Sequence, residues 1–322
     1  MPSRTLSIFE NYLDQDFAYF LGLIVARGET EEDGRNRRIM IDFPLGSLQA
    51  EGVKISYNKV KELKLAVGEI RDRLYELLGQ NVQMKISNRQ VQLKVHFETN
   101  NLIWRNLRQY LKGKKSFREF EIPGQIYDAD VSIQKEFVRG FCDIAATVRK
   151  SNADQGCRHR VYIDVLNPNW HLPIQLCALL QKHLDVPVSN ILWGHPNTRE
   201  PNKPRRGRTW AREHQIRVYA EAFLPIGFYV EYKNTILKEL AQINKKESNY
   251  KPKPCNPHRS VKHVRRRKTK HPEEKSARIP KEIRGRHFNA YWQICLGMGC
   301  KQATKPDPNQ IEMFETDSSE EE

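Results

Sequence analysis

The chain has 322 residues, a hydrophobic fraction of 39% and a formal net charge of +15, with 54 Lys and Arg residues against 39 Asp and Glu residues. This length predicts two domains or one two-lobed domain, and the apolar content argues against general disorder. No apolar run reaches the roughly 18 residues of a membrane span, and no signal-peptide pattern opens the chain. The six cysteines are irregularly spaced, which indicates a reducing compartment.

Charge and chain order then narrow the class of protein. A pI near 9.5 favours a polyanionic partner, usually nucleic acid, and hence a cytoplasmic, nucleoid-associated location. Apolar periodicity, turn residues and the stop at Gly79 define the elements of the first half. These predicted elements are a helix at 12–26 capped by Asp14 or Asp16, a strand at 38–45, a helix at 57–78, strands at 82–86 and 91–97, and a helix at 100–111.

The second half repeats this order. Its predicted elements are a helix at 133–145, a strand at 160–166, a helix at 172–184, strands at 190–193 and 215–220, and a helix at 229–243. Gly22 and Gly140 occupy matching places in the two opening helices, 118 residues apart. An internal repeat of this kind constrains the fold more strongly than local propensity does.

The predicted strands have one apolar and one polar face, because side chains alternate with a period of two. The polar faces are rich in Gln, Lys, Arg and Tyr. The side chains of Gln, Lys and Arg can reach base edges in a major groove. We therefore predict a nucleic-acid-reading surface, with an ordinary basic sheet face as the alternative. The candidate contacts on these strands are Lys85, Gln92, Lys94, Arg160 and Arg217.

The two opening helices resemble a known motif. Residues 17–28 read Phe-Ala-Tyr-Phe-Leu-Gly-Leu-Ile-Val-Ala-Arg-Gly, and residues 137–148 include an Arg-Gly-Phe opening. Both segments resemble the LAGLIDADG motifs of homing endonucleases, and Ile226-Gly227-Phe228 resembles the closing segment of that family. The resemblance covers about residues 8–243. It implies an α/β (α+β) monomer of two pseudo-symmetric αββαββα repeats, residues 1–125 and 126–245, forming a saddle over double-stranded DNA.

The chain departs from the family where the resemblance places the metal-binding acids. Those two positions are Arg27 and Ala145, and neither side chain binds Mg²⁺. Asp143 is either a structural cap or a relocated ligand. Glu29 could also supply a replacement carboxylate, although we expect Glu29, Glu31, Glu32 and Asp33 to form a solvated loop.

These substitutions predict a protein that binds DNA without cleaving it. The first alternative is an active, divergent endonuclease that uses Mg²⁺ through Glu29 or Asp143. RNA is a second possible target, because maturases that resemble this family bind RNA. A third alternative is a factor of replication or repair that associates with the sliding clamp.

The C-terminal third is dominated by charge. Residues 251–286 hold 14 basic and three acidic residues, whereas residues 306–322 hold seven acids and neither Lys nor Arg. Such blocks are either flexible linkers or arms that follow a DNA backbone. We expect a basic extension at 246–304 and an acidic, disordered tail at 305–322. The candidate backbone contacts are Arg205, Arg206, Arg265, Arg266 and Arg267.

Two shorter patterns lie in the same third. Cys255, His258, Cys295 and Cys300 form two pairs of zinc-ligand types, with four unrelated residues as the alternative. In the tail, Gln310-Ile311-Glu312-Met313-Phe314 resembles the pentapeptide by which bacterial proteins bind the sliding clamp. We expect Gln310, Ile311, Met313 and Phe314 to dock in a groove, or the apolar residues to fold back onto the body.

Overall fold

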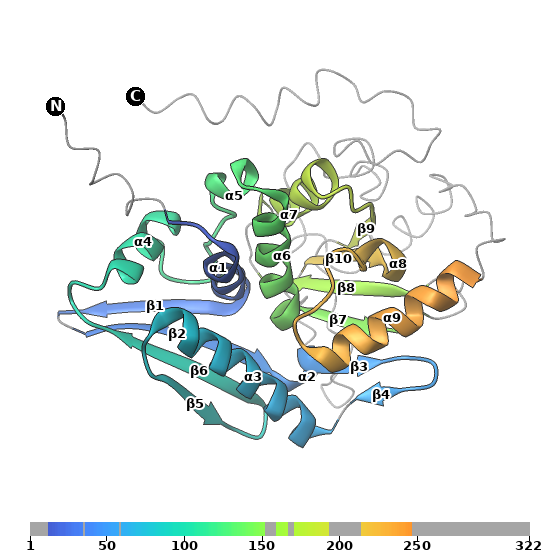
Figure 1. The fold of residues 1–322 in the computed structure, drawn as a ribbon, viewed down its shortest axis with the longest axis horizontal. Helices are drawn as coiled ribbons and strands as arrows, with labels where there is room; N and C mark the ends of the chain where they lie inside the picture. The colour runs from blue at the N-terminus through green and yellow to red at the C-terminus, as the bar shows by residue number, and fades with distance from the viewer. Residues whose placement is uncertain are drawn as a thin grey trace, which may run out of the picture.

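A computed structural model of the chain describes residues 12–34, 36–57, 59–151, 159–166, 171–192 and 214–246. Two β-sheets lie side by side, and helices α1 (Gln15–Arg27) and α6 (Val131–Ala145) pack together between them (Figure 1). Each sheet has an apolar face that packs against helices and a polar face on its other side. This arrangement places those functional candidates that belong to the described residues on the two polar faces and at the ends of α1 and α6.

The first half contains a four-stranded sheet in the order β1-β2-β6-β5. Its elements after α1 are β1 (Gly28–Asp33), β2 (Asn36–Pro44), α3 (Val60–Leu78), β5 (Val82–Ile86), β6 (Gln90–Phe97) and α4 (Leu102–Tyr110). Of the two predicted caps of α1, Asp14 and Asp16, the structure shows Asp14, whose side chain accepts a hydrogen bond from the Phe17 amide at 2.8 Å. Helix α3 ends at Gly79, which adopts φ of 57°, as the glycine stop predicts.

The second half repeats the strand order as β7-β8-β10-β9. Its elements are α5 (Gly124–Asp128), α6, β7 (Ala146–Arg149), β8 (Arg160–Val165), α7 (His171–Ala178), which continues as a π-helical turn at Leu179–His183, β9 (Val188–Leu192), β10 (His214–Tyr219), α8 (Ala220–Phe223) and α9 (Glu231–Lys246). The matching order confirms the predicted α/β fold of two pseudo-symmetric repeats.

Helices α1 and α6 meet through a reciprocal pair of glycines. A Cβ added at Gly22 would overlap the carbonyl oxygen of Phe137 and lie 2.8 Å from the amide nitrogen of Phe141. A Cβ at Gly140 would overlap the carbonyl oxygen of Tyr19 and lie 2.9 Å from its carbonyl carbon. Only glycine permits such a close approach of two backbones, which explains why the sequence has glycine at both places.

The acidic run after α1 forms a strand, so the prediction of a solvated loop for Glu29, Glu31, Glu32 and Asp33 is wrong. These residues belong to β1, and antiparallel pairing with β2 sets Glu31 opposite Arg38 and Glu32 opposite Arg37. The Arg37 guanidinium lies 3.1 Å from the Glu32 carboxylate. Opposite charges across the register therefore support a strand that its intrinsic propensity disfavours.

One segment of the first half crosses to the second sheet. The segment contains α2 (Leu45–Leu48), β3 (Ala50–Glu51) and β4 (Ser56–Tyr57), and β3 pairs in parallel with β7. Helix α9 holds it in place, because Tyr232 donates a hydrogen bond to the Leu48 carbonyl at 2.6 Å. The second sheet thus has six strands, β4-β3-β7-β8-β10-β9, an asymmetry that the repeat pattern does not predict.

Candidate nucleic-acid interface

Each central helix leads directly into the first strand of a sheet. Arg27 ends α1 immediately before β1, and Ala145 ends α6 immediately before β7. These are the two positions where the sequence resemblance expects metal-binding acids. A guanidinium and a methyl group offer no oxygen to Mg²⁺, so the pair does not fit a two-metal site.

Asp143, the other acid of the second motif, lies in the interior and is fully buried. Its carboxylate accepts a hydrogen bond from the Tyr19 hydroxyl at 2.9 Å. It also accepts hydrogen bonds from the backbone amides of Tyr229 at 3.2 Å and Val230 at 3.4 Å, just before α9 begins. Burial raises the pKa of Asp143 to about 6, against the opposing effects of Lys233 and these hydrogen bonds. This geometry is that of an internal cap that joins α1, α6 and α9.

Lys233 of α9 completes this buried group. Its ammonium donates hydrogen bonds to the carbonyl oxygens of Asp143 at 2.6 Å and Ala146 at 2.8 Å. A cation is favourable here because the last carbonyls of a helix lack partners within the helix and carry partial negative charge. Burial lowers the pKa of Lys233 to about 8, with the Asp143 carboxylate opposing that change. The sequence repeat places Val25 where the second half has Asp143, so only one half contains this group.

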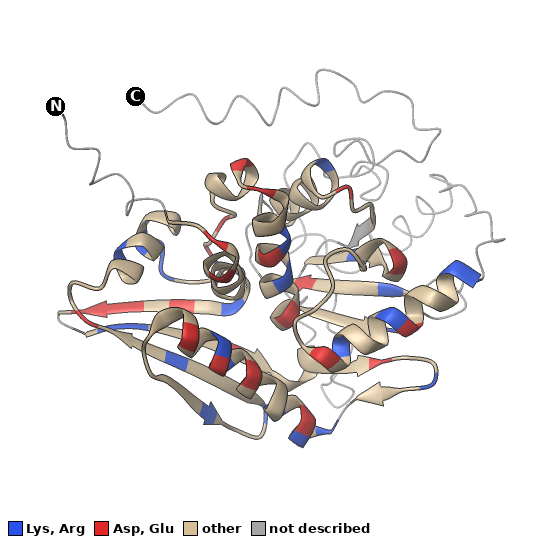
Figure 2. Cartoon of the chain, in the orientation of Figure 1, with Lys and Arg blue, Asp and Glu red and all other residues tan. Residues whose placement is uncertain are grey.

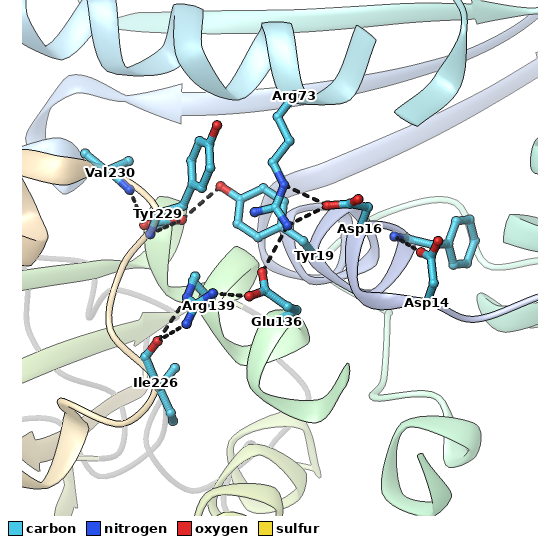
Figure 3. A network of polar contacts seen from close by, with 11 residues as sticks. Asp14, Asp16, Tyr19, Arg73, Glu136, Arg139, Ile226, Tyr229 and Val230 are labelled. Carbon is cyan, nitrogen blue, oxygen red and sulfur yellow. Dashed lines mark hydrogen bonds and ion pairs between the residues drawn. The ribbon is translucent and has the colours of Figure 1, made fainter. Parts of the chain in front are cut away.

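A second polar network fixes the helices that carry the sheets. Arg73 of α3 lies over the ring of Tyr19 at 4.0 Å and over the ring of Tyr229 at 4.8 Å (Figure 3). Its guanidinium forms ion pairs with Asp16 at 2.7 Å and with Glu136 at 3.1 Å. Because these partners come from α1, α6 and the segment before α9, one side chain links both halves.

The polar face of the first sheet matches the predicted alternation but has no excess of cations. Gln92 and Lys94 of β6 lie on this face, and the Gln92 amide donates to the Asp42 carboxylate at 2.8 Å. Figure 2 shows the acids along β1. By register, the charged residues that share the face are Arg38, Lys85, Lys94, Glu29, Glu31, Asp33 and Asp42. Three cations therefore face four carboxylates.

The polar face of the second sheet carries stacked arginine and tyrosine side chains. The Arg149 guanidinium lies 4.4 Å and the Arg217 guanidinium 5.3 Å from the centre of the Tyr162 ring. Arg160 lies 4.9 Å from the centre of the Tyr219 ring. We call these five residues, Arg149, Arg160, Tyr162, Arg217 and Tyr219, the arginine–tyrosine layer.

The layer is compact and predominantly cationic. Arg160 is 8% exposed and Tyr162 is 3% exposed. Burial lowers the pKa of Arg217 to about 10; Tyr162 opposes this change and Arg160 adds to it. Arg217 therefore remains charged at neutral pH. The register places two acids on this face: Glu51 lies opposite Arg149, and Asp164 accepts a hydrogen bond from Gln215 at 2.9 Å.

Glu29 is a single carboxylate at the end of α1. It lies in β1, pairs with Met40 of β2 and forms an isolated bridge to Ser116. The repeat spacing makes Thr147 of β7 its counterpart in the second half. The two halves therefore do not present a matched pair of acids at these positions either.

The remaining candidates lie outside the described residues. They are Arg205, Arg206, Arg265, Arg266 and Arg267 among the DNA contacts, Cys255, His258, Cys295 and Cys300 among the zinc ligands, and Gln310, Ile311, Met313 and Phe314 in the clamp-like pentapeptide. Among the residues that the structure describes, no three His, Cys, Asp or Glu side chains gather into a group that could hold a metal ion. No helix in the described ranges is long and apolar enough to cross a membrane.

Several solved structures are similar to this chain. A mesophilic variant of the homing endonuclease I-DmoI has 12% sequence identity and a TM-score of 0.37, covering 71% of this chain and 96% of that one. Full-length DUF199/WhiA from Thermatoga maritima has 12% identity and a TM-score of 0.38, covering 94% and 88%. The N-terminal LAGLIDADG domain of DUF199/WhiA has 11% identity and a TM-score of 0.34, covering 73% and 84%.

Sequence comparison adds no relative to these structures. No protein-family model and no curated protein matches the chain. At identities of 11–12%, residue roles do not transfer from the similar structures. The roles proposed below therefore rest on the contacts of this chain itself.

Sequence reasoning missed two polar residues of the second sheet. Arg149 and Thr147 lie on β7, a strand that the sequence did not predict because it is short and follows the helix without a turn signal. The alternation Ala-Thr-Val-Arg after the second motif was the available signal. It places Thr147 and Arg149 on the same face as Tyr162 and Arg160, their partners in β8.

Proposed function

We propose that this chain binds double-stranded DNA on the polar faces of its two sheets and does not cleave it. The arginine–tyrosine layer carries this proposal. Three guanidinium groups, those of Arg149, Arg160 and Arg217, lie on one sheet face, where the described strands add two acids, Asp164 and Glu51. A phosphate backbone supplies negative charge, and guanidinium groups bind phosphate well.

The two sheets are proposed to contribute different parts of the binding free energy. The layer on the second sheet supplies phosphate contacts, which give affinity without sequence information. On the first sheet, the Gln92 amide and the Lys85 and Lys94 ammonium groups can contact base edges in a major groove. The acids beside them oppose indiscriminate attraction to phosphate, so this face favours selectivity over affinity.

We infer the absence of cleavage from the residues at the two helix ends, which lack the oxygen ligands that metal ions need. Hydrolysis by paired metal ions requires carboxylates at both helix ends, and the chain has Arg27 and Ala145 there. Asp143 holds Tyr19 and the start of α9 with its carboxylate. Arg27 can neutralise a phosphate but cannot lower the pKa of water.

The first experiment is to incubate the full chain with fragmented genomic DNA, with and without Mg²⁺ or Mn²⁺, and to sequence the retained fragments and any new ends. We expect intact fragments enriched around one motif. Metal-dependent ends at a fixed position that disappear in a Glu29→Ala variant would instead establish an active, divergent endonuclease. Retention of structured RNA in preference to duplex DNA would overturn the choice of nucleic acid.

For the basic extension, we propose a zinc site formed by Cys255, His258, Cys295 and Cys300. The support is the pairing of four suitable ligand types in the sequence. Elemental analysis of the purified chain should give one equivalent of zinc, and a Cys255→Ser variant should lose it. Less than a tenth of an equivalent in the unmodified chain would remove this proposal.

For the tail, we propose that residues 310–314 bind a sliding clamp and localise the protein to replicating DNA. The support is the resemblance of the pentapeptide to clamp-binding segments and its position next to an acidic, polar sequence. A pull-down with purified clamp should succeed with the unmodified chain and fail with Phe314→Ala. An unchanged interaction in that variant would exclude the pentapeptide as the contact.

A further inference from the structure

A pocket of about 420 Å³ opens where the crossing segment of the first half meets β7. Its lining includes Gly46, Gln49 and Glu51 from the first half and Thr147 and Arg149 from the second. Volumes of about 300–1,000 Å³ are typical of pockets for small organic ligands. Register places Thr147 and Arg149 on the face of the arginine–tyrosine layer, so the pocket adjoins the proposed DNA-binding surface.

One side chain in the pocket is buried without a hydrogen-bond partner. Thr147 is 4% exposed, and its hydroxyl oxygen makes no hydrogen bond within the structure. A buried, unsatisfied hydroxyl costs about 1–3 kcal/mol, so a ligand that bonds to it gains free energy. In the first half, the repeat spacing places Glu29 at the position of Thr147. Glu29 is charged, and its strand is bridged to Ser116.

We propose that this pocket binds one nucleotide and prefers guanine. Arg149 can donate to the O6 and N7 atoms of guanine, the commonest arginine–base contact. The Glu51 carboxylate lies opposite Arg149 in the β3–β7 register and can accept from the N1 and N2 hydrogens. Adenine offers no N1 hydrogen, so it cannot satisfy both residues. The hydroxyl of Thr147 then bonds to a remaining polar atom of the nucleotide.

The contacts that Glu51 already makes are compatible with this role. Its carboxylate forms an ion pair with Lys150 at 3.3 Å, and both side chains are about half exposed. An exposed pair of this kind contributes little to stability, so it can yield to a base. The backbone carbonyl of Glu51 accepts from the Lys150 amide at 3.0 Å, which keeps the wall of the pocket in place.

The nucleotide can come from two sources. A free guanosine monophosphate can enter directly, or a base of the bound duplex can turn out of the stack. The second source rests on the proposed function, because the DNA must already lie on the sheet. The cost of unstacking is smallest for a base that is already unpaired. A single extrahelical guanine in a duplex is therefore the appropriate probe for the second source.

The test uses the full chain in two assays, calorimetric titration with guanosine and adenosine monophosphates, and fluorescence anisotropy with a duplex that carries one extrahelical guanine. Thr147→Val should weaken guanine binding about threefold to tenfold, the effect of one hydrogen bond. Gly46→Phe should abolish it by filling the pocket, because a Cβ at Gly46 meets no atom within 4 Å. Thr235→Val on α9 makes the same chemical change away from the pocket and should have no effect.

The outcomes separate the two sources and the two proposals. If the free nucleotide binds and both pocket variants weaken that binding, the ligand of the pocket is a free nucleotide. If only the duplex with the extrahelical guanine binds, the ligand is a base of the bound DNA. Absence of both, or binding unaffected by Thr147→Val and Gly46→Phe in folded protein, overturns the pocket. A perfectly paired duplex is titrated in parallel, and its failure to bind overturns the proposed function while the free-nucleotide arm still decides the pocket.

Discussion

The two halves of the molecule have the same strand order but different chemistry on their polar faces. Each sheet begins at the end of a central helix, and each central helix contacts the other through one glycine. The first sheet presents three cations and four carboxylates. The second presents three arginines stacked on two tyrosines with two acids.

This difference shows which residues of a repeat the packing of the fold requires and which can vary between the two halves. The glycine pair is fixed because a side chain at either place would enter the backbone of the facing helix. A polar strand face needs only hydrophilic side chains to remain compatible with the fold. The two faces can therefore carry different side chains on one common framework, as the proposed division into affinity and selectivity requires.

The largest expected effect tests the shared framework. Gly22→Ala and Gly140→Ala should each destabilise the protein by about 3 kcal/mol, the upper end of the usual cost of overpacking, or prevent folding, because overpacking against backbone cannot be relieved by a rotamer change. Urea unfolding followed by circular dichroism measures this change. The control, Gly68→Ala in α3, has open space around the new methyl group and should stabilise the helix by about 0.5–1 kcal/mol. Equal behaviour of all three variants would contradict the tight packing of α1 and α6.

The second prediction concerns the buried acid that only the second half contains. The pKa of Asp143 in the folded protein, about 6, exceeds its ordinary value of 3.8, so the folded state binds the proton more tightly. The stabilisation by protonated Asp143 is full below pH 3.8 and is lost as the pH rises to about 6. This difference in pKa corresponds to about 3 kcal/mol.

An Asp143→Asn variant isolates this dependence from that of the other carboxylates. The unfolding free energy of the unmodified protein, minus that of the variant, should increase as the pH falls from 7 to 4. Urea titrations at several pH values give both quantities. A difference that stays constant over this range would mean that Asp143 titrates in the folded protein as it does in the unfolded chain.

The third prediction compares the two faces directly. Arg149→Gln and Arg217→Gln should each weaken binding to random-sequence duplex about fivefold to tenfold and lower the salt dependence by about one counterion. Lys94→Gln on the first sheet should change random-sequence binding about twofold and alter the preferred motif instead. Anisotropy titrations at several salt concentrations separate these effects. Equal losses from both faces would remove the division into affinity and selectivity.

The smallest expected effect concerns the link between the halves. The Glu239 carboxylate of α9 accepts hydrogen bonds from the backbone amides of Val53 at 3.2 Å and Lys54 at 2.7 Å. Glu239→Ala should cost about 1 kcal/mol and speed hydrogen exchange at those two amides. Exchange at the Val67 amide in α3 provides the internal reference and should not change.

The two-repeat order of helices and strands could be predicted from the sequence, but the arrangement of charged side chains on the second sheet could not. The matching glycines, the Asp14 cap, the Gly79 stop and the alternation in β6 each have a local physical cause, so they could be predicted. β1 and β7 could not, because their strand conformation depends on pairing with β2 and β8 rather than on propensity. The arginine–tyrosine layer arises from three strands that meet only in the folded chain. The pocket needs β3 against β7, a contact between residues about a hundred positions apart.

The crossing segment, which contains α2, β3 and β4, also makes the two halves of the molecule unequal. Strand β3 pairs along the edge of β7. The edge of β1 pairs instead with the segment around residue 116: the Phe117 amide donates to the Gly28 carbonyl, and the Thr30 amide donates to the Lys115 carbonyl, each at 2.8 Å. The edges of β1 and β7 are thus completed by unrelated segments, and the pseudo-two-fold relation of the strands does not extend to these edges. A palindromic operator mirrors a symmetric protein. For the proposed binding to DNA, a chain built this way is instead suited to an asymmetric target, on which it would lie in one orientation only, so that reversing the site would reverse the protein.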